Sequence, residues 1–255
     1  MGAVRHPSTR LPHALPEPGP APKLGAPIRS ASSRATGRMQ TNDAARGANG
    51  GAPNVTPVFP LILLETMRDM DRPEEYLEGE DVAVSMPRRL GLSDVIYTQI
   101  HRFREEVKRK RPQSADVVAD LIRLVIRRPD ADAIFEEAGR RVARHAWGER
   151  SKPFRRIVRF MPAVLAQRSA HRAARRLVRQ LAGDGDFRLT NRPLGLQIQG
   201  SLTGRADPGG AACAFYSGAL SELMTEYLGR RHAAQHPRCE TRGAGACEWV
   251  TLVVS

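Results

Sequence analysis

All three cysteines of the 255-residue chain lie in its last quarter, at Cys213, Cys239 and Cys247, and His236 stands three residues before the second. Thiolate and imidazole are side chains that zinc prefers in a tetrahedral site. The H-x-x-C spacing lets a bent backbone direct both side chains at one ion, and the glycines of Gly243–Gly245 permit a tight turn between the last two cysteines. The sequence therefore predicts a Cys₃His zinc site made by Cys213, His236, Cys239 and Cys247.

Two other interpretations of the cysteines stay open at the level of sequence. The three side chains could be small buried hydrophobic residues, or Cys239 and Cys247 could form a disulfide across a hairpin. An Arg-rich chain without a secretory signal favours a reducing compartment, so we expect a cytoplasmic protein without that disulfide. A complete Cys₃His set leaves no position for a reacting water, so the predicted zinc is structural and no catalytic residue is assigned.

The formal net charge of +13 suggests an anionic partner at first sight. Residues 88–179 hold 24 Lys/Arg against 10 Asp/Glu, which accounts for essentially the whole excess. No nucleic-acid-binding signature accompanies the charge, so nucleic acid is only a secondary candidate partner. No apolar run approaches the roughly 20 residues of a membrane span, and we expect a protein without one.

The hydrophobic pattern divides the chain into three regions. Residues 1–55 are rich in Pro, Ala, Gly, Ser and Arg without periodicity, which predicts a disordered tail. Residues 56–130 predict a helical N-terminal region, with a short apolar helix over 55–70, an acidic helix and loop over 74–87, and helices over 93–111 and 114–128. Residues 131–255 predict a domain with helices over 130–147 and 154–181, two strands over 187–198, a loop over 205–210, a helix over 212–228 and a terminal hairpin over 231–254.

The helix over 154–181 is predicted to bend at Pro162 and to have two contrasting faces. Its predicted buried line contains Ile157, Phe160/Met161, Val164/Leu165, Ala174, Leu177/Val178 and Leu181, and arginines occupy the opposite face. That basic face predicts either a solvated surface or docking to an acidic partner or a membrane surface. Ligand-pocket candidates are Phe154, Phe160, Met161, Phe215, Tyr216 and Met224, although core packing explains their pattern equally well. His145 or His171 could coordinate the metal ion of a bound ligand or hydrogen-bond to a phenolic ligand.

The cysteine segment also resembles a known family. A cysteine before a helix, a short strand ending in Cys239, the Gly243–Gly245 turn and the run Cys247-Glu248-Trp249 are similar to the 4-vinyl reductase domain family. Shorter upstream pieces, Glu137–Arg141, Arg159–Pro162 and Asn191–Leu194, strengthen the resemblance to members such as bacteriochlorophyll 4-vinyl reductase. In zinc-binding members an acidic ligand stands where this chain has His236.

This resemblance implies an α+β fold of the 4-vinyl reductase/TRAPP-like type, with a helical N-terminal half packed on a small antiparallel sheet, and a homodimer. It further implies a module that binds a small hydrophobic ligand or tetrapyrrole and assists bacteriochlorophyll synthesis. An enzyme or enzyme partner that reduces the 4-vinyl group of a chlorophyllide precursor is an alternative, although no G-x-G-x-x-G hydride-donor site is present. A ligand sensor or scaffold that acts through basic helices on a protein or nucleic acid is the third possibility.

Overall fold

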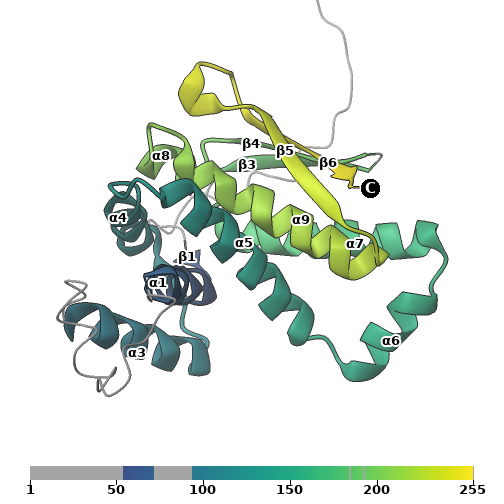
Figure 1. The fold of residues 1–255 in the computed structure, drawn as a ribbon, viewed down its shortest axis with the longest axis horizontal. Helices are drawn as coiled ribbons and strands as arrows, with labels where there is room; N and C mark the ends of the chain where they lie inside the picture. The colour runs from purple at the N-terminus through teal and green to yellow at the C-terminus, as the bar shows by residue number, and fades with distance from the viewer. Residues whose placement is uncertain (1–53, 72–93, 184, 192, 255) are drawn as a thin grey trace, which may run out of the picture. The chain divides into compact units, whose positions relative to one another are not determined.

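The computed structural model describes residues 54–71, 94–183, 185–191 and 193–254 (Figure 1). The α-helices are α1 (Val58–Met70), α3 (Asp94–Lys108), α4 (Ala115–Val125), α5 (Ala131–Gly148), α6 (Lys152–Phe160), α7 (Ala163–Leu181), α8 (Leu202–Ala206) and α9 (Ala214–Leu228). The strands are β1 (Asn54–Val55), β2 (Gln113–Ser114), β3 (Asp186–Asn191), β4 (Leu194–Gln199), β5 (His232–Arg238) and β6 (Cys247–Val253), and the 3₁₀ helices are η1 (Ala211–Cys213) and η2 (Glu240–Arg242).

This mixture of helices and antiparallel strands confirms the α+β class. The predicted acidic segment 74–87 lies outside the described residues, as does the predicted tail apart from its last two residues. Those two residues correct the prediction, because Asn54 and Val55 form β1, which pairs with β2, and Val55 is buried. None of the described helices is both long enough and apolar enough to cross a membrane.

Four strands form an antiparallel sheet in the order β3-β4-β6-β5. The two strands predicted over 187–198 and the predicted terminal hairpin are both present. Leu194, Leu196 and Ile198 of β4 are buried, whereas Gln197 and Gln199 between and after them are exposed, as the period of two predicts. Helix α9 packs on β5, α7 packs on β3, and α5 packs on α9 (Figure 1). The core therefore lies between one face of the sheet and these helices.

The contact between α5 and α9 is close because a glycine faces the partner helix from each side. A Cβ on Gly139 of α5 would lie 2.8 Å from the backbone nitrogen of Ala219 and closer still to the carbonyl oxygen of Phe215. A Cβ on Gly218 of α9 would lie 2.8 Å from the carbonyl carbon of Glu136. These are backbone atoms that cannot rotate away, so the crossing depends on both glycines.

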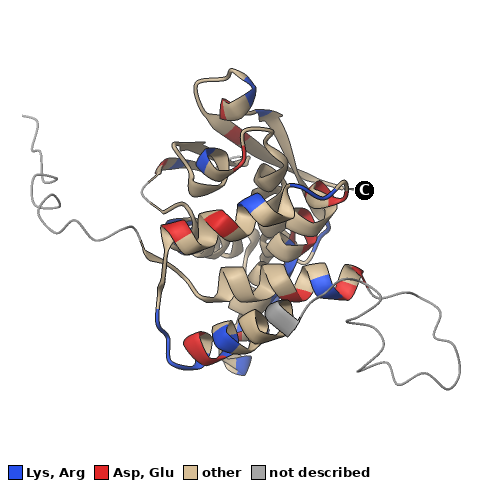
Figure 2. Cartoon of the chain, turned by 90° about the vertical axis from the view of Figure 1, so that its left-hand side faces the viewer, with Lys and Arg blue, Asp and Glu red and all other residues tan. Residues whose placement is uncertain are grey.

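Ion pairs join the N-terminal helices to each other and to α5. Arg104 Nη2 lies 2.6 Å from Glu65 Oε1, and Arg141 Nη1 lies 2.6 Å from Asp69 Oδ2. Arg128 binds Asp71 at 2.5 Å, and this carboxylate follows α1 directly. Figure 2 accordingly shows residues of both charge signs on the helices of this side. Much of the positive charge of this region is therefore neutralised locally.

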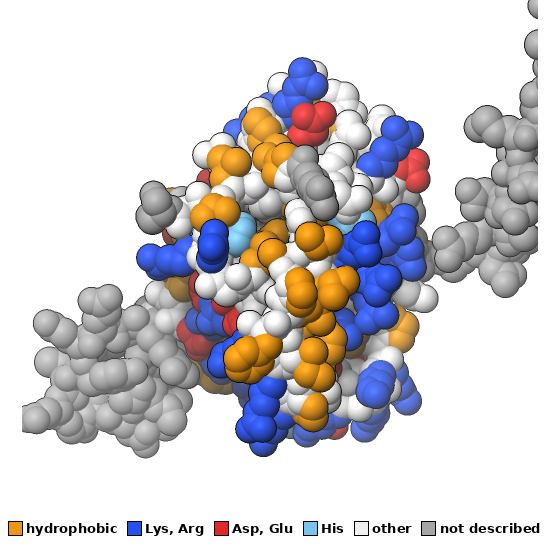
Figure 3. All heavy atoms as spheres, turned by 90° about the vertical axis from the view of Figure 1, so that its right-hand side faces the viewer, with side chains coloured by type: hydrophobic (Ala, Val, Ile, Leu, Met, Phe, Trp, Pro, Cys, Tyr) orange, Lys and Arg blue, Asp and Glu red, His pale blue; other side chains and the backbone are white. Residues whose placement is uncertain are grey.

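The predicted bend at Pro162 is a complete break between α6 and α7, with Pro162 as the residue before α7. Because the chain turns a corner there, much of the predicted buried line is on the surface. Ile157, Phe160, Val164 and Leu165 are exposed, which corrects the prediction that they face the core. Hydrophobic side chains gather with Lys and Arg beside them on this side of the molecule (Figure 3). The later part of the line, Ala174, Leu177, Val178 and Leu181, is buried as predicted.

The predicted loop over 205–210 begins inside a helix instead. Ser201 accepts a hydrogen bond from the backbone N–H of Gly204 at 3.0 Å and so caps α8, which ends at Ala206. The turn that follows leads directly into η1 and to Cys213.

Candidate metal centre

The four predicted metal ligands come from three elements that the sheet brings together. Cys213 ends η1 and immediately precedes α9, His236 lies in β5, Cys239 follows β5, and Cys247 begins β6. The β5–β6 hairpin therefore supplies three side chains and the helix start supplies the fourth. Gly243 makes the required turn with φ of 91°, whereas Gly245 does not adopt a positive φ.

The ligand atoms have the spacing of a tetrahedral metal site. One ligand atom from each of the four residues lies within 4.8 Å of all the others. Cys247 Sγ lies 3.8 Å from Cys213 Sγ and 4.0 Å from Cys239 Sγ. A tetrahedron with Zn–S bonds of about 2.3 Å has S–S edges of about 3.8 Å. The site can therefore hold a metal ion with little rearrangement.

The same distances decide between the other interpretations of the cysteines. All three cysteines are free. The sulfur atoms of Cys239 and Cys247 lie 4.0 Å apart, far beyond the roughly 2.05 Å of an S–S bond, so the alternative of a disulfide between them is wrong for this structure. All three are also buried, as ordinary small hydrophobic residues would be. The interpretation as ordinary buried residues does not explain why all three sulfurs lie close to the His236 side chain.

His236 is held in place by an irregularity in the sheet and by an aromatic ring. The register of β5 against β6 shifts between Gln235 and Arg238, and this bulge re-aims the intervening side chains. The imidazole stacks on Trp249, with ring centroids 4.5 Å apart and planes 8° apart. Its Nε2 atom is buried without a hydrogen-bond partner in the described structure. A bound metal ion would explain a polar ring left in this position.

The local electrostatics favour a thiolate among the sulfurs. The hydrogen bond that Cys247 shares with Cys213, together with His236 and the backbone N–H of Glu240, outweighs burial and lowers the pKa of Cys247 to about 4. The same hydrogen bond and burial raise the pKa of Cys213 above its usual range. The Glu240 N–H donates to Cys247 Sγ at 3.2 Å. A metal that replaces the shared proton would meet sulfurs already close together.

Two acidic residues that the sequence did not indicate, Asp207 and Glu240, fix the segments that carry the candidate ligands. The buried carboxylate of Asp207 accepts hydrogen bonds from the backbone N–H groups of Gly209 at 2.8 Å and Ala212 at 2.7 Å, which fixes the turn before Cys213. Glu240 accepts from the Gly200 N–H at 2.9 Å and ties the hairpin loop to the end of β4. The Asp-Pro-Gly-Gly run was a signal for the turn, but nothing in the sequence marked the side chain of Glu240.

A Cβ on Gly210 would lie 3.0 Å from Cys239 Sγ, and its φ of 82° is one that side chains rarely adopt. This glycine therefore allows the segment before Cys213 to pass directly beside the cluster.

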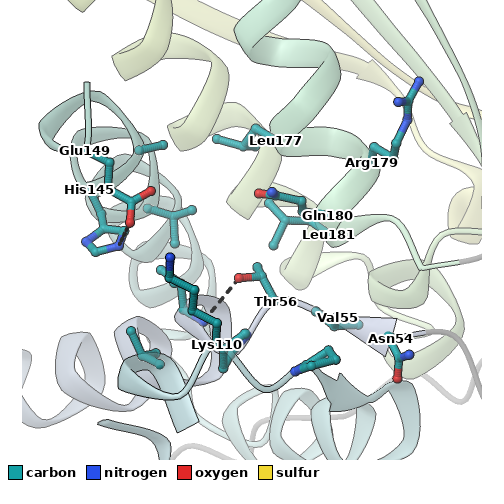
Figure 4. A pocket seen from close by; sticks show the side chains of 16 residues that line it. Asn54, Val55, Thr56, Lys110, His145, Glu149, Leu177, Arg179, Gln180 and Leu181 are labelled. Carbon is teal, nitrogen blue, oxygen red and sulfur yellow. Dashed lines mark hydrogen bonds and ion pairs between the residues drawn. The ribbon is translucent and has the colours of Figure 1, made fainter. Parts of the chain in front are cut away.

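A cavity of about 600 Å³ lies elsewhere, among β1, the start of α1, the end of α3 and the C-terminal parts of α5 and α7. Its lining includes Val55, Val58, Val107, Val142, Leu177 and Leu181. In Figure 4, Lys110 reaches between the His145–Glu149 side and Gln180, while Arg179 points away. The histidine Nε2 lies 3.6 Å from Glu149 Oε1.

Of the predicted ligand-binding residues, only His145 lines this cavity. Phe215, Tyr216 and Met224 are buried in the core, Phe160 is exposed, and Phe154, Met161 and His171 are half-buried elsewhere. The pocket candidates Phe215, Tyr216 and Met224 are therefore part of the packed core. Tyr216, for example, packs between Phe215 and Trp249 at centroid distances of 5.6 and 5.0 Å.

Lys110 is unusual because its backbone is left-handed, with φ of 52°, the single positive value among the described non-glycine residues. Its N–H donates to the carbonyl of Val107 at 3.0 Å, and the N–H of Arg111 donates to that of Glu106 at 2.9 Å. This is the Schellman arrangement at a helix end, in which glycine is the usual residue at the left-handed position. Lysine is less stable than glycine at such a position.

Comparison of the chain with known protein families, with curated proteins and with solved structures finds no match.

Proposed function

We propose that this protein is a binding module for a small apolar molecule with an acidic group, and that a structural zinc ion holds its terminal hairpin to α9. One observation carries the binding function: a cavity of about 600 Å³ that is lined by both apolar and polar side chains and has the left-handed Lys110 in its lining. This volume lies within the usual range for ligand pockets. The valine and leucine side chains suit an apolar body, and the ammonium group suits a carboxylate.

Zinc is the proposed ion because three thiolates and one imidazole form a closed set of soft and borderline ligands. Oxygen-preferring cations such as magnesium and calcium do not fit these donors. With all four positions filled by protein, the ion would act by connecting η1 to the β5–β6 hairpin. Part of its binding energy would then be folding energy.

A tetrapyrrole with a carboxylate side chain, such as a chlorophyllide, is the more specific ligand that the sequence resemblance suggests. In that version His145 would be the candidate magnesium ligand, and the module would assist bacteriochlorophyll synthesis as a homodimer. Reduction of a vinyl group by this chain is the alternative proposal. The support for both is the resemblance together with a cavity of suitable size.

The metal is tested by elemental analysis of the purified full-length protein. About one zinc per chain is expected, with loss of the metal in Cys239→Ser and retention in Ser169→Ala, which removes a side-chain oxygen on α7, a helix that supplies none of the four candidate ligands. A wild-type protein that is fully folded without metal, and that gains no thermal stability from added zinc, would contradict the zinc proposal.

The binding function is tested with Lys110→Gly and two probes, 1-anilinonaphthalene-8-sulfonate and an uncharged naphthalene analogue. Glycine removes the cation and also the left-handed strain, so stability should rise by up to about 1 kcal/mol while affinity for the sulfonate falls about tenfold. Lys108→Gly is the matched control, because Lys108 is exposed and does not line the cavity. It should lose stability and keep its affinity.

Unchanged sulfonate affinity in Lys110→Gly, or equal affinity of the wild type for both probes, would refute the role of this cavity. Absorption titration with a chlorophyllide then decides the tetrapyrrole version. Product formation from a divinyl chlorophyllide with a nicotinamide donor and no other protein would establish the enzyme alternative.

A further inference from the structure

The segment that contains α6 and α7 is entirely cationic. Between residues 152 and 183 the sequence holds nine basic residues and no Asp or Glu. They are Lys152, Arg155, Arg156, Arg159, Arg168, Arg172, Arg175, Arg176 and Arg179. All except Arg155 are classed as exposed, and Arg155 is half-buried. Residues 152–183 therefore form one continuous stretch in which every charged side chain is positive.

These nine cations differ from the arginines of α5 because none of them forms an ion pair with a described residue. Arg140, Arg141 and Arg144 of α5 all contact carboxylates. Near α6 the acidic neighbour is Glu226 of α9, whose pKa is raised by burial and by Glu222, although Arg159 and Arg155 draw it down. One partly buried carboxylate cannot neutralise four cations on α6. Within the described residues, most of the charge on α6 is therefore not neutralised by a carboxylate.

Exposed apolar side chains lie at the corner where these two helices meet. Phe160 is 89% exposed and Ile157 58%, and Val164 and Leu165 are each 46% exposed. Ile157 and Phe160 are three residues apart on α6 and so share one side of the helix. Figure 3 shows hydrophobic side chains running down this side of the molecule between groups of Lys and Arg. We call the four apolar residues and the cations of α6 the α6–α7 corner.

We propose that the α6–α7 corner docks on an anionic lipid surface. Phe160 and its apolar neighbours would enter the boundary between headgroups and acyl chains, and the arginines would bind lipid phosphates. Apolar side chains combined with basic residues and without acids are the features of helices that lie in a membrane interface. Each cation close to an anionic leaflet adds to the attraction.

Charge and shape favour this occupant over the alternatives. A second copy of the chain would bring two uncompensated cationic faces together, which repel each other. Single-stranded nucleic acid is bound by stacking on aromatic rings, and three of the four exposed apolar residues here are aliphatic. An acidic protein would match the charge but would need a pocket to receive Phe160, whereas a lipid surface accepts a projecting apolar side chain without one.

The test is sedimentation of the full-length, metal-loaded protein with two kinds of vesicle. One is made of phosphatidylcholine alone, and the other contains about 30% of the anionic lipid phosphatidylglycerol. We expect binding to the anionic vesicles only. Phe160→Ser should weaken it about tenfold or more through lost apolar burial. The double variant Arg156→Glu/Arg159→Glu should weaken it by at least about 25-fold, because two attractive charges become repulsive.

The matched control is Arg109→Glu/Arg111→Glu, which makes the same change in net charge at exposed positions after α3. It should retain affinity to within a few-fold. Since the altered positions are exposed, each variant should keep the circular dichroism spectrum and zinc content of the wild type.

Three results would overturn the proposal. The first is equal binding to neutral and anionic vesicles, or none to either. The second is equal loss in the control and corner variants, which would mean that only net charge matters. The third is binding of Phe160→Ser to anionic vesicles with the affinity of the wild type.

If the wild type binds no vesicles but forms dimers that Phe160→Ser abolishes, the corner is a self-association surface instead. Binding of an RNA oligonucleotide that needs the two arginines but not Phe160 would assign it to nucleic acid.

Discussion

Replacing Gly139 by alanine tests the α5–α9 crossing on which the position of Cys213 depends. In an exposed helix this substitution stabilises by about 1 kcal/mol, because alanine restricts the unfolded chain and favours the helix. Here the added Cβ would meet the Ala219 backbone nitrogen at 2.8 Å and the Phe215 carbonyl group at 3.0 Å or less. Ordinary carbon contacts lie at about 3.5–4.0 Å, so the two helices would have to separate by on the order of 1 Å.

Separating the two helices would weaken contacts along the whole α5–α9 interface, and not only those next to the added methyl group. A gap of this size forfeits about a quarter to a half of the dispersion attraction of the atoms that line it, and overpacking of a core typically costs about 1–3 kcal/mol. Because both helices meet along a buried interface that includes Phe215 and Ala138, we expect the upper end of this range. The predicted loss is about 3 kcal/mol of unfolding free energy, opposite in sign to the helix propensity.

The same helix supplies the control. Gly148 ends α5 and a Cβ there would meet nothing within 4 Å. Gly148→Ala should therefore be neutral or stabilise by up to about 1 kcal/mol. Urea unfolding followed by circular dichroism at 222 nm (about the helical minimum) gives both free energies from midpoints at a shared slope. If Gly139→Ala proves as stable as Gly148→Ala, the close crossing described above is wrong.

Three further perturbations test the surroundings of the site and the N-terminal ion pairs. Asp207→Ala should cost about 2–3 kcal/mol by urea unfolding, since the N–H groups of Gly209 and Ala212 lose their acceptor. Asp207→Asn, which keeps one acceptor oxygen, should cost less, and equal costs would count against the carboxylate as the anchor of the turn. Gly210→Ala should weaken zinc affinity in a competitive chelator titration, because its Cβ would press on Cys239 Sγ in a left-handed backbone; unchanged affinity would show that the segment can move aside. Burial acts to raise the pKa of Asp69, but hydrogen bonds from Arg141 and Arg68 outweigh it and hold this pKa below 3.8. Because this pKa is lower in the folded state, the charged carboxylate stabilises the fold at any pH above the pKa of the unfolded state. This contribution is lost as the pH falls through the pKa of the folded state. The stability difference between wild type and Asp69→Asn should therefore be constant above about pH 5 and shrink below about pH 4; a difference that grows on acidification would reverse the assigned sign.

Local sequence was sufficient to predict most elements. Ser114, Pro162 and Gly229 lie at helix boundaries, and the alternation in 194–199 identified both the strand and its buried face. These signals work because capping, the missing N–H of proline and the period of two depend on neighbours within a few residues. The four candidate metal ligands were predicted for a related reason, since thiol and imidazole side chains are few in this chain and chemically specific.

The tertiary structure decided which surfaces are covered. Periodicity identified an apolar stripe through Ile157, Phe160 and Leu165, but it contained no information on whether another element packs against it. The break at Pro162 turns that stripe outward. The cavity likewise joins β1, α3, α5 and α7, which are distant in sequence, and Lys110 in its lining has a left-handed backbone where glycine is the usual residue. Burial and enclosure depend on contacts between distant segments, so they emerge only when the chain is folded. The four candidate metal ligands could be proposed from the sequence because thiol and imidazole groups are chemically specific.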